Sequence, residues 1–179
     1  QGNISIACPS SSPVASFVPE LNVLDSPWVF NDRQKIYDTL DSEVGQKLLE
    51  TVSSANMKGL GYFENGIRHL SSNREINSMS DLKGLKIRVA GSSVLNNAYQ
   101  AWGANWANAN WSEVFTALQT GTYDGQENPL PTADGASIAE VQKYVTYWTG
   151  VYDCIFFTMN ADLYNSLSPE LQAIVDECG

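Results

Sequence analysis

The amino-acid sequence predicts an α/β fold. Short apolar segments with strand character alternate along the 179 residues with segments in which apolar residues recur at helical spacing. The clearest example is the strand predicted at 85–89, whose apolar residues share one face and which leads into a helix capped by Ser93 and ended by Gly103. The sequence has no internal repeat, low-complexity segment or compositional break. Its length therefore suits either one large domain or two small ones.

The first 54 residues predict one strand and two helices. Residues 4–8 alternate loosely and end at a proline, as expected of a short buried strand. The segment 17–30 is apolar but interrupted by prolines, which indicates an ordered, irregular connection. Asp32 is expected to cap a helix that ends at Leu40, and a second helix is expected at 42–54. The apolar residues on one face of this second helix are Val44, Leu48, Leu49 and Val52.

Between residues 60 and 110 the pattern predicts a hairpin and two further strands. Residues 60–63 and 67–70 form short strands on either side of an E-N-G turn at 64–66. A D-L-K-G turn at 81–84 then precedes the strand at 85–89. Small apolar and polar residues alternate imperfectly at 103–110, which predicts a weak strand.

The segment 111–129, W-S-E-V-F-T-A-L-Q-T-G-T-Y-D-G-Q-E-N-P, predicts a helix followed by a short polar strand. Ser112 is the expected N-cap and Gly121 the expected C-terminal stop. The polar second half ends on a proline, which is typical of an edge strand whose side chains reach a hydrogen-bonding partner. These side chains are Gln126, Glu127 and Asn128. An aromatic residue before the helix and amides after it suit a small ligand with one flat side and one polar side.

The remaining elements continue the alternation. They are predicted as a helix at 131–141, strands at 144–148 and 151–159, a helical turn at 162–166, and a last helix capped by Ser168. A proline at the first position of this last helix supports its start, because that position needs no backbone donor.

Charge and cysteine content exclude several classes of function. The net charge of −10 argues against nucleic acid or an anionic membrane as a partner, and no apolar run is long enough to span a membrane. The chain opens directly on a predicted strand, without a basic and apolar signal segment. Cys8, Cys154 and Cys178 have no C-x-x-C spacing, so they predict neither a zinc site nor a disulfide framework and are expected to be buried free thiols.

Arg88 is the strongest candidate for a binding residue. It lies on a strand whose opposite face is apolar, just before the chain turns into a helix, and ligands collect at the carboxyl ends of strands in α/β sheets. A guanidinium there can hold a carboxylate through two parallel hydrogen bonds. The alternative is a structural ion pair with an aspartate or glutamate. Arg68 carries the same two alternatives at a less favourable position.

Catalytic alternatives have little support in the sequence. His69 is the only histidine, and no G-x-S-x-G segment accompanies it, so a Ser-His-Asp triad is not expected. Asp124 and Glu127 could be read as paired hydrolase carboxylates, but they lie in a turn and point to opposite faces of extended chain. Phosphate-binding glycine motifs and metal-ligand clusters are absent from the sequence, and no cofactor is expected. Among the large rings of the second half, Trp111 is best placed to line a cleft, because a loop residue before a helix is not on its packed face.

Several segments resemble the substrate-binding proteins of tripartite ATP-independent periplasmic (TRAP) transporters, a family that includes sialic-acid and C4-dicarboxylate binders. The segment 111–129 matches the family pattern W/F-S-E-V-Y-x-A-L-Q-T-G-x-x-D-G-Q-E-N-P almost without gaps. The other matching segments are P-E-L-N-V-L-D-S-P-W-V-F at 19–30, N-G-I-R-H-L-S-S-N-R-E-I at 65–76, D-L-K-G-L-K-I-R-V-A at 81–90 and E-V-Q-K-Y-V-T at 140–146.

The resemblance implies a role for individual residues. Arg88 matches the arginine that clamps the ligand carboxylate, and Arg68 a second arginine that contacts ligand in some members. Trp111 matches an aromatic residue that packs on the ligand, and Asn128 an amide that bonds its carboxylate. The candidate ligand-binding residues are therefore Arg88, Asn128, Arg68 and Trp111, with Glu127, Ser10 in the hydroxyl-bearing loop 9–13, and Tyr152 as further candidates. Ala90 departs from the family proline at its position, which should change loop stiffness more than chemistry.

The resemblance also implies a two-lobed fold of the periplasmic-binding-protein type, with hinge strands and a ligand cleft between the lobes. Residues 1–66 and 154–179 are expected to form parts of lobe I, and residues 67–153 lobe II, with hinges near Ile67 and Tyr152. The family's N-terminal strand–helix region with its signal peptide, and its last helices, are not matched by this chain. We therefore expect it to be a fragment.

Such a protein does no covalent chemistry. The resemblance implies a monomeric extracytoplasmic receptor, periplasmic and possibly lipid-anchored in its full length, that delivers a carboxylate-bearing organic acid or sugar acid to the small and large TRAP membrane subunits. Two alternatives remain open: a ligand-sensing domain of a signalling system, and a hydrolase that uses Asp124 or Glu127. The asparagine-rich segment 105–110 favours a hydroxylated sugar acid over a bare dicarboxylate.

Overall fold

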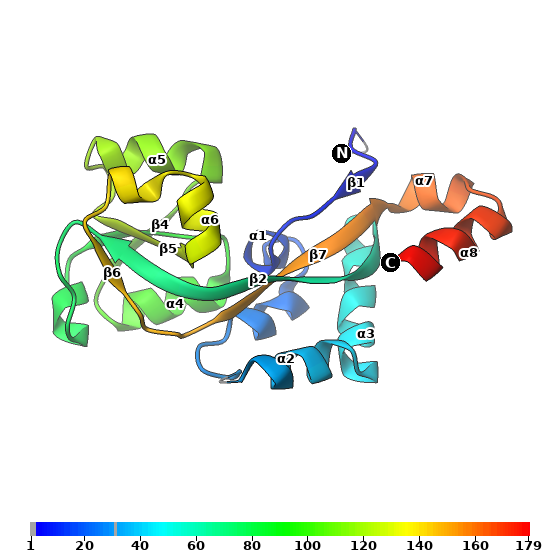
Figure 1. Cartoon of the computed structure of the whole chain (residues 1–179), viewed down its shortest axis with the longest axis horizontal. Helices are drawn as coiled ribbons and strands as arrows, with labels where there is room; N and C mark the ends of the chain where they lie inside the picture. Colours follow the sequence, from blue (N-terminus) through cyan, green and yellow to red (C-terminus); the bar gives the residue numbers. More distant parts are fainter. Residues whose placement is uncertain (1–2, 31) are drawn as a thin grey trace.

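One open, mixed sheet runs along the length of the molecule (Figure 1). The computed structural model describes residues 3–30 and 32–179. In this part of the chain the strand order is β1-β7-β2-β5-β3-β4, with β6 paired to β2 beside this path. The strands are β1 (Ile6–Ala7), β2 (Met57–Ser72), β3 (Lys86–Val89), β4 (Asn105–Asn108), β5 (Gly125–Pro129), β6 (Tyr144–Thr146) and β7 (Tyr152–Asn160).

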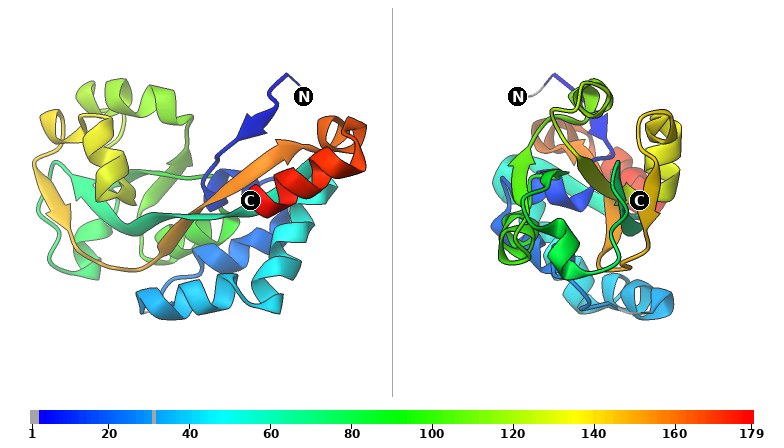
Figure 2. Two further views of the ribbon diagram at one scale, coloured as in Figure 1. Left: turned by 45° about the vertical axis from the view of Figure 1, so that its right-hand side comes forward. Right: turned by 90° about the vertical axis from the view of Figure 1, so that its left-hand side faces the viewer.

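Helices surround both ends of this sheet. The α-helices are α1 (Ser11–Ala15), α2 (Arg33–Leu40), α3 (Glu43–Glu50), α4 (Ser93–Ala101), α5 (Trp111–Gln119), α6 (Leu130–Gly135), α7 (Ala161–Ser166) and α8 (Pro169–Cys178). The 3-10 helices are η1 (Pro19–Asp25), η2 (Thr51–Ala55), η3 (Met79–Leu82) and η4 (Ile138–Glu140). Elements α2, α3, α7 and α8 lie at one end, and α4, α5 and α6 at the other (Figures 1 and 2). We name these ends the α2/α3 half and the α4/α5 half. The expected α/β class is confirmed.

Strands β2 and β7 connect the two halves. β2 pairs antiparallel with β7 from Met57 to Ile67, and from Arg68 to Ser72 it pairs with β5 and β6. The long green and orange ribbons therefore cross the middle of the molecule together (Figure 1). The first part of β2 therefore belongs to the sheet of the α2/α3 half, and its last part to the sheet of the α4/α5 half.

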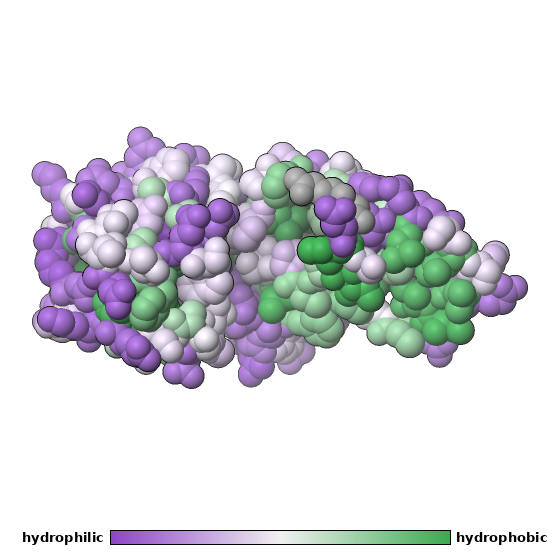
Figure 3. All heavy atoms as spheres, turned by 90° about the horizontal axis from the view of Figure 1, so that it is seen from above, coloured by the Kyte–Doolittle hydropathy of each residue, from purple (hydrophilic) through white to green (hydrophobic). Residues whose placement is uncertain are grey.

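The apolar core is divided in the same way. One cluster includes Val18, Leu21, Ile36 and Phe156 and fills the α2/α3 half. Two further clusters lie in the α4/α5 half, one around Ile87 and Leu95 and one around Val114 and Leu118. Figure 3 shows hydrophobic surface concentrated over the end that carries β1, α7 and α8. The exposed apolar residues there include Ile4, Ile6, Leu171 and Ile174. None of the helices in the described part of the chain is long and apolar enough to cross a membrane.

Several helix starts follow the predicted capping residues. The Asp32 side chain accepts a hydrogen bond from the Lys35 amide at the start of α2, and Ser168 accepts one from Leu171 at the start of α8. Two predicted caps are wrong. Helix α4 is capped by Ser92 instead of Ser93, and α5 begins at Trp111, before Ser112, without a side-chain cap. The glycine stops are confirmed, since Gly103 and Gly121 both take positive φ.

Three other expectations are wrong. The predicted hairpin at 60–70 is one continuous strand, because β7 pairs across the E-N-G segment and a bulge beside Gly66, with φ +117°, absorbs the irregularity. Strand β5 is not an edge strand; it lies between β2 and β3 with every residue buried. Part of the expected 9–13 loop folds as α1.

Smaller differences concern burial. Val44 is 67% exposed, because α3 packs through Gly45 and Leu49 and the chain continues as η2 instead of a longer α-helix. All three cysteines are free thiols, as expected, but only Cys154 is buried. Cys8 and Cys178 lie at the surface, Cys8 directly after β1 and Cys178 as the last residue of α8.

Candidate functional site

A cavity of about 340 Å³ lies where the carboxyl end of β3 faces the first loop of the chain. We name it the Arg88 cavity. Its lining comes from both halves: Cys8, Ser10, Pro13, Asn65, Arg68, Arg88, Ala90, Trp111, Asn128, Thr132 and Ile155. A second hollow of about 590 Å³ adjoins it and shares Pro13, Arg88 and Trp111. The candidate residues Ser10, Arg68, Arg88, Trp111 and Asn128 are therefore brought together around one cavity.

Arg88 is buried without an acidic partner. Its side chain lies on β3 with only 5% of the residue exposed, and it forms no ion pair among the described residues. The Nε and Nη2 atoms both donate to the Ala109 carbonyl oxygen, at 3.1 and 2.8 Å. The guanidinium carbon lies 5.5 Å from the centre of the Trp111 ring. Burial lowers the pKa of Arg88, against the opposing charge of Glu127, and the group keeps a positive charge that no direct contact neutralises.

Arg68, by contrast, is fully engaged by the protein. It is 1% exposed on β2 and forms ion pairs with the carboxylates of Glu127 and Asp153, the latter through Nη1 and Oδ2 at 2.6 Å. Its Nη2 atom also donates to Asn128 Oδ1 at 3.1 Å. Burial opposes its charge, but the two carboxylates prevail and raise the pKa of Arg68. The structural ion pair considered in the sequence analysis is thus present, and the guanidinium still borders the cavity.

Strand β5 holds the polar groups behind the cavity. Glu127 is fully buried, pairs with Arg68 and accepts a hydrogen bond from the Ala90 amide at 3.3 Å, so it fixes the end of β3 and does not line the cavity. Asn128 lines the cavity, and its Nδ2 atom donates to Gln126 Oε1 at 2.8 Å. Gln126 donates in turn to Ser71 Oγ at 2.9 Å. This chain of amides sets the orientation in which Asn128 meets the cavity.

Tyr152 lies elsewhere. Its ring packs edge-on against Tyr37 at 6.4 Å within the core of the α2/α3 half, and its hydroxyl donates to Glu64. Burial and the Glu64 carboxylate raise the pKa of Tyr152. Tyr152 is not among the residues that line the Arg88 cavity.

Comparison with known proteins assigns the chain to a family. The family model described as "Bacterial extracellular solute-binding protein, family 7" matches residues 1–178. The chain belongs to this family.

Family 7 relatives match nearly the whole chain but extend well beyond it. A "Solute-binding protein" of Verminephrobacter eiseniae is 41% identical over 177 residues, which is 98% of this chain and 53% of that protein. A TRAP periplasmic solute-binding protein of Polaromonas sp. JS666 bound to D-erythronate superposes with a TM-score of 0.94 at 31% identity, covering 98% of this chain and 58% of that one. The corresponding protein of Sulfurospirillum deleyianum with bound succinate gives 0.92 at 37% identity, covering 98% and 57%. The chain thus spans about half the length of the relatives it matches.

Three residues at or beside the Arg88 cavity were not predicted. Asn65 was taken as part of a turn, but its Nδ2 atom donates to Asp153 at 2.6 Å and its Oδ1 atom accepts from Thr132 at 3.0 Å. Asp153 is fully buried on β7. A signal for Asp153 existed in the sequence, since an aspartate inside the apolar strand Y-D-C-I-F-F requires a buried partner. No comparable signal marked Asn65 or Thr132.

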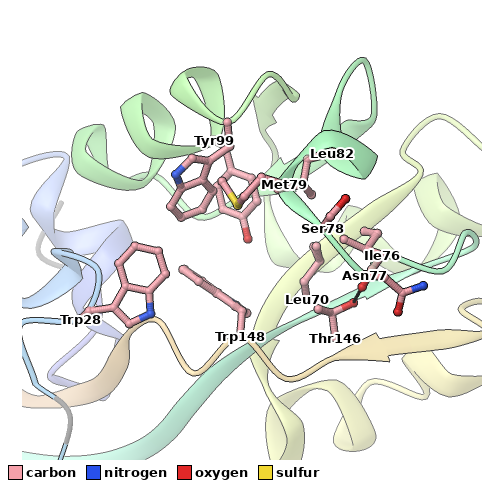
Figure 4. A pocket seen from close by; sticks show the side chains of 11 residues that line it. Trp28, Leu70, Ile76, Asn77, Ser78, Met79, Leu82, Tyr99, Thr146 and Trp148 are labelled. Atoms are coloured by element: carbon pink, nitrogen blue, oxygen red, sulfur yellow. Dashed lines mark hydrogen bonds between the residues drawn. The ribbon is translucent and has the colours of Figure 1, made fainter.

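A separate cavity, of about 270 Å³, is lined in part by aromatic rings (Figure 4). Trp28, Tyr99, Trp102 and Trp148 pack through edge-on and tilted contacts, with centroids 5.1 to 6.1 Å apart. The remaining lining residues are Leu70, Ile76, Asn77, Ser78, Met79, Leu82 and Thr146, and none of the lining residues is charged. This aromatic cavity therefore offers an anion no counter-charge, in contrast to the Arg88 cavity.

The residues considered for catalysis each have their own surroundings. Asp124 Oδ2 accepts the Lys86 amide hydrogen at 2.8 Å and so holds the start of β3. His69 lines a different hollow, of about 750 Å³, and burial lowers its pKa. Within residues 3–30 and 32–179, no group of three potential ligand side chains could hold a metal ion.

Proposed function

We propose that this chain is the ligand-binding part of an extracytoplasmic receptor that takes up a carboxylate-bearing organic acid or sugar acid and delivers it to a TRAP membrane transporter. The observation that carries the proposal is Arg88: a buried guanidinium that lines a cavity and has no acidic partner among the residues that the structure describes. A cation in such a place gains most from an anion that enters the cavity, because the low local polarity strengthens their attraction. Membership of family 7 supports the same reading.

The proposed roles follow the contacts. Arg88 binds the ligand carboxylate through the guanidinium edge that the Ala109 carbonyl leaves free, and Trp111 provides a flat wall beside it. Asn128 donates an amide hydrogen, and Ser10 provides a hydroxyl from the opposite half. Arg68 borders the ligand, while Glu127 keeps Arg68 and the end of β3 in position. Tyr152, at the start of β7, supports the fold by packing on Tyr37 and by its hydrogen bond to Glu64, and it does not contact the ligand.

We also propose that the two halves act as lobes. Lobe I would comprise residues 1–66 and 154–179, and lobe II residues 67–153. The separate apolar clusters and the paired strands β2 and β7 support this division. Ligand then favours the closed form by as much as it binds that form better than the open one.

The ligand class is proposed to be a hydroxylated monocarboxylate. Around the Arg88 cavity, Ser10, Asn65 and Thr132 add hydroxyl and amide groups that suit the hydroxyls of a sugar acid. A related protein is bound to the sugar acid D-erythronate. Another holds succinate, so a dicarboxylate is the closest competitor.

A thermal-shift and calorimetric panel on the complete protein tests this function. The panel contains D-erythronate, D-galacturonate, succinate and a 2-oxo acid, and erythritol serves as the matched compound without a carboxylate. We expect at least one acid to raise the melting temperature and erythritol to leave it unchanged. If no acid of the panel binds, the proposed function is wrong.

Trp111→Ala is expected to weaken acid binding less than loss of Arg88 does, and to change the order of preference among the acids. The ring contributes a cation–π contact of about 0.5–2 kcal/mol and a flat wall, but no hydrogen bond to the carboxylate. The melting-temperature panel measures this order. Trp111→Phe, which keeps a flat ring, is the control and should keep the original order. An unchanged order in Trp111→Ala would count against the role of Trp111.

A further inference from the structure

The buried region behind the Arg88 cavity contains more acids than bases. Asp25, Glu127 and Asp153 are each fully buried, whereas the buried guanidinium groups are those of Arg68 and Arg88. Arg68 forms ion pairs with both Glu127 and Asp153, and Asp25 forms none among the described residues. With every group ionised, this set carries one negative charge more than it has positive charges. A ligand carboxylate raises that excess to two, which burial makes costly.

The carboxylate oxygens around Asp25 also outnumber the hydroxyl hydrogens that they can accept. Asp25 Oδ1 accepts from Ser12 Oγ at 2.8 Å. Ser11 Oγ lies 3.3 Å from Asp25 Oδ1 and 3.0 Å from Asp153 Oδ1, yet a hydroxyl has a single hydrogen to donate. Asp25 Oδ2 is buried and accepts no hydrogen bond among the described residues, because the nearby Ser92 hydroxyl donates to Asn22 Oδ1 at 3.1 Å. A proton on Oδ2 of Asp25 would remove a buried negative charge that has too few hydrogen-bond donors around it.

Other titratable groups near Asp25 do not offer this proton site. The elements that pack on η1 are α1, α4 and β7. From these, Tyr99 on α4 and Cys154 on β7 have their pKa values raised by burial, so they stay protonated and neutral, and α1 carries no titratable side chain. Burial raises the pKa of Asp25 to about 6, while Arg68 opposes and Asp153 reinforces this shift. Asp25 therefore titrates close to neutral pH.

We propose that Asp25 is a proton acceptor coupled to ligand binding: when a carboxylate occupies the Arg88 cavity, Oδ2 of Asp25 takes up a proton from the solvent. The coupling runs through Arg68, which lines the cavity and acts on Asp25 by its charge. The negative potential of a bound anion offsets part of the positive potential that Arg68 exerts at Asp25. The charged form of Asp25 then becomes less favourable. This inference rests on the proposed function, because it requires an anion in that cavity.

The sign of the pH dependence follows from linkage. Since the bound anion raises the pKa of Asp25 further, binding takes up a proton at pH values between the free and bound pKa. Affinity for the acid is therefore higher at low pH and falls as pH rises through this window. The limit for one proton is about a tenfold change in Kd per pH unit.

Calorimetry on the complete protein tests the coupling. D-Erythronate and D-galacturonate are the probes, because a single sugar-acid carboxylate stays ionised above about pH 5.5. Titrations at about pH 6.5 in buffers of different ionisation enthalpy give the number of protons taken up. We expect a net uptake greater than zero, approaching one, and tighter binding at about pH 6 than at about pH 8.

Three variants identify the group that takes the proton. Asp25→Asn should bind with no proton uptake and with a Kd that does not vary across this pH range. Asp38→Asn removes an exposed carboxylate of α2 and should keep the uptake of the parent protein. His69→Gln should also keep it, because His69 lines another hollow.

The possible failures are distinguishable. If neither probe nor any other acid of the panel binds at any pH, the proposed function fails. If an acid binds to the parent protein without proton uptake, or if the uptake persists in Asp25→Asn or disappears in His69→Gln, the coupling is wrong while the binding function stands. Should Asp25→Asn not fold, the measurement on the parent protein and the ¹³C chemical shift of the Asp25 carboxyl, with and without D-erythronate, decide the question.

Discussion

Arg88→Ala is expected to weaken binding of an organic acid at least tenfold. The wild-type guanidinium is buried, borders the cavity and has no acidic partner within residues 3–30 and 32–179, so a ligand carboxylate would supply the anionic contact that these residues do not. Hydrogen bonds to charged groups contribute about 1.5–3 kcal/mol each. Every ~1.4 kcal/mol corresponds to a tenfold change in Kd. Isothermal titration of the acid that binds in the panel measures the change.

Arg88→Lys should also lose at least tenfold, although it keeps the charge. Lysine has one ammonium group and cannot both bond the Ala109 carbonyl and present two parallel donors to a carboxylate. Arg33→Ala, at an arginine exposed on α2, is the control and should bind like the parent protein. Unchanged affinity in either Arg88 variant would refute the clamp role.

Arg68→Met is expected to lower the free energy of unfolding by about 3–5 kcal/mol, the usual cost of removing one partner from a buried ion pair. The substitution leaves Glu127 and Asp153 buried without their cation. It also removes the donor to Asn128 Oδ1. Urea unfolding, followed by circular dichroism at neutral pH, gives the free-energy difference.

Arg33→Met provides the matched control within the same protein. Arg33 pairs with Glu64 at the surface, where 66% of the arginine side chain is exposed. Solvent screens such a pair, so the expected loss is much smaller than that of Arg68→Met. If both variants lose equally little, the buried network around Arg68 does not stabilise the fold as described.

Local chemistry predicted much of the fold. Asp32 and Ser168 cap helices as expected because a capping side chain and the amides that it accepts lie within one turn of each other. The hairpin at 60–70 failed for the opposite reason. Whether E-N-G reverses the chain depends on β7, a partner about 90 residues away that pairs on both sides of it. The polar composition of β5 likewise suggested an edge, since its compensation by Arg68 and Ser71 is invisible in the local sequence.

The candidate site was predictable in part. Arg88 could be placed from strand periodicity and the turn that follows it, and the structure puts it on a cavity. The roles of Arg68 and Glu127 could not be decided from the sequence, because a ligand clamp and a structural ion pair need the same residue types. Asn65 and Asp25 were missed, since their roles come from contacts with Asp153 and Ser12 that only the folded chain creates.

Strand β2, which both halves share, couples their unfolding. Its first stretch is held by β7 and its last by β5 and β6, with no loop between them to serve as a point of separation. If either half unfolds, β2 loses backbone hydrogen bonds, and the sheet of the other half contains the same strand. We therefore expect the two halves to unfold together in one transition.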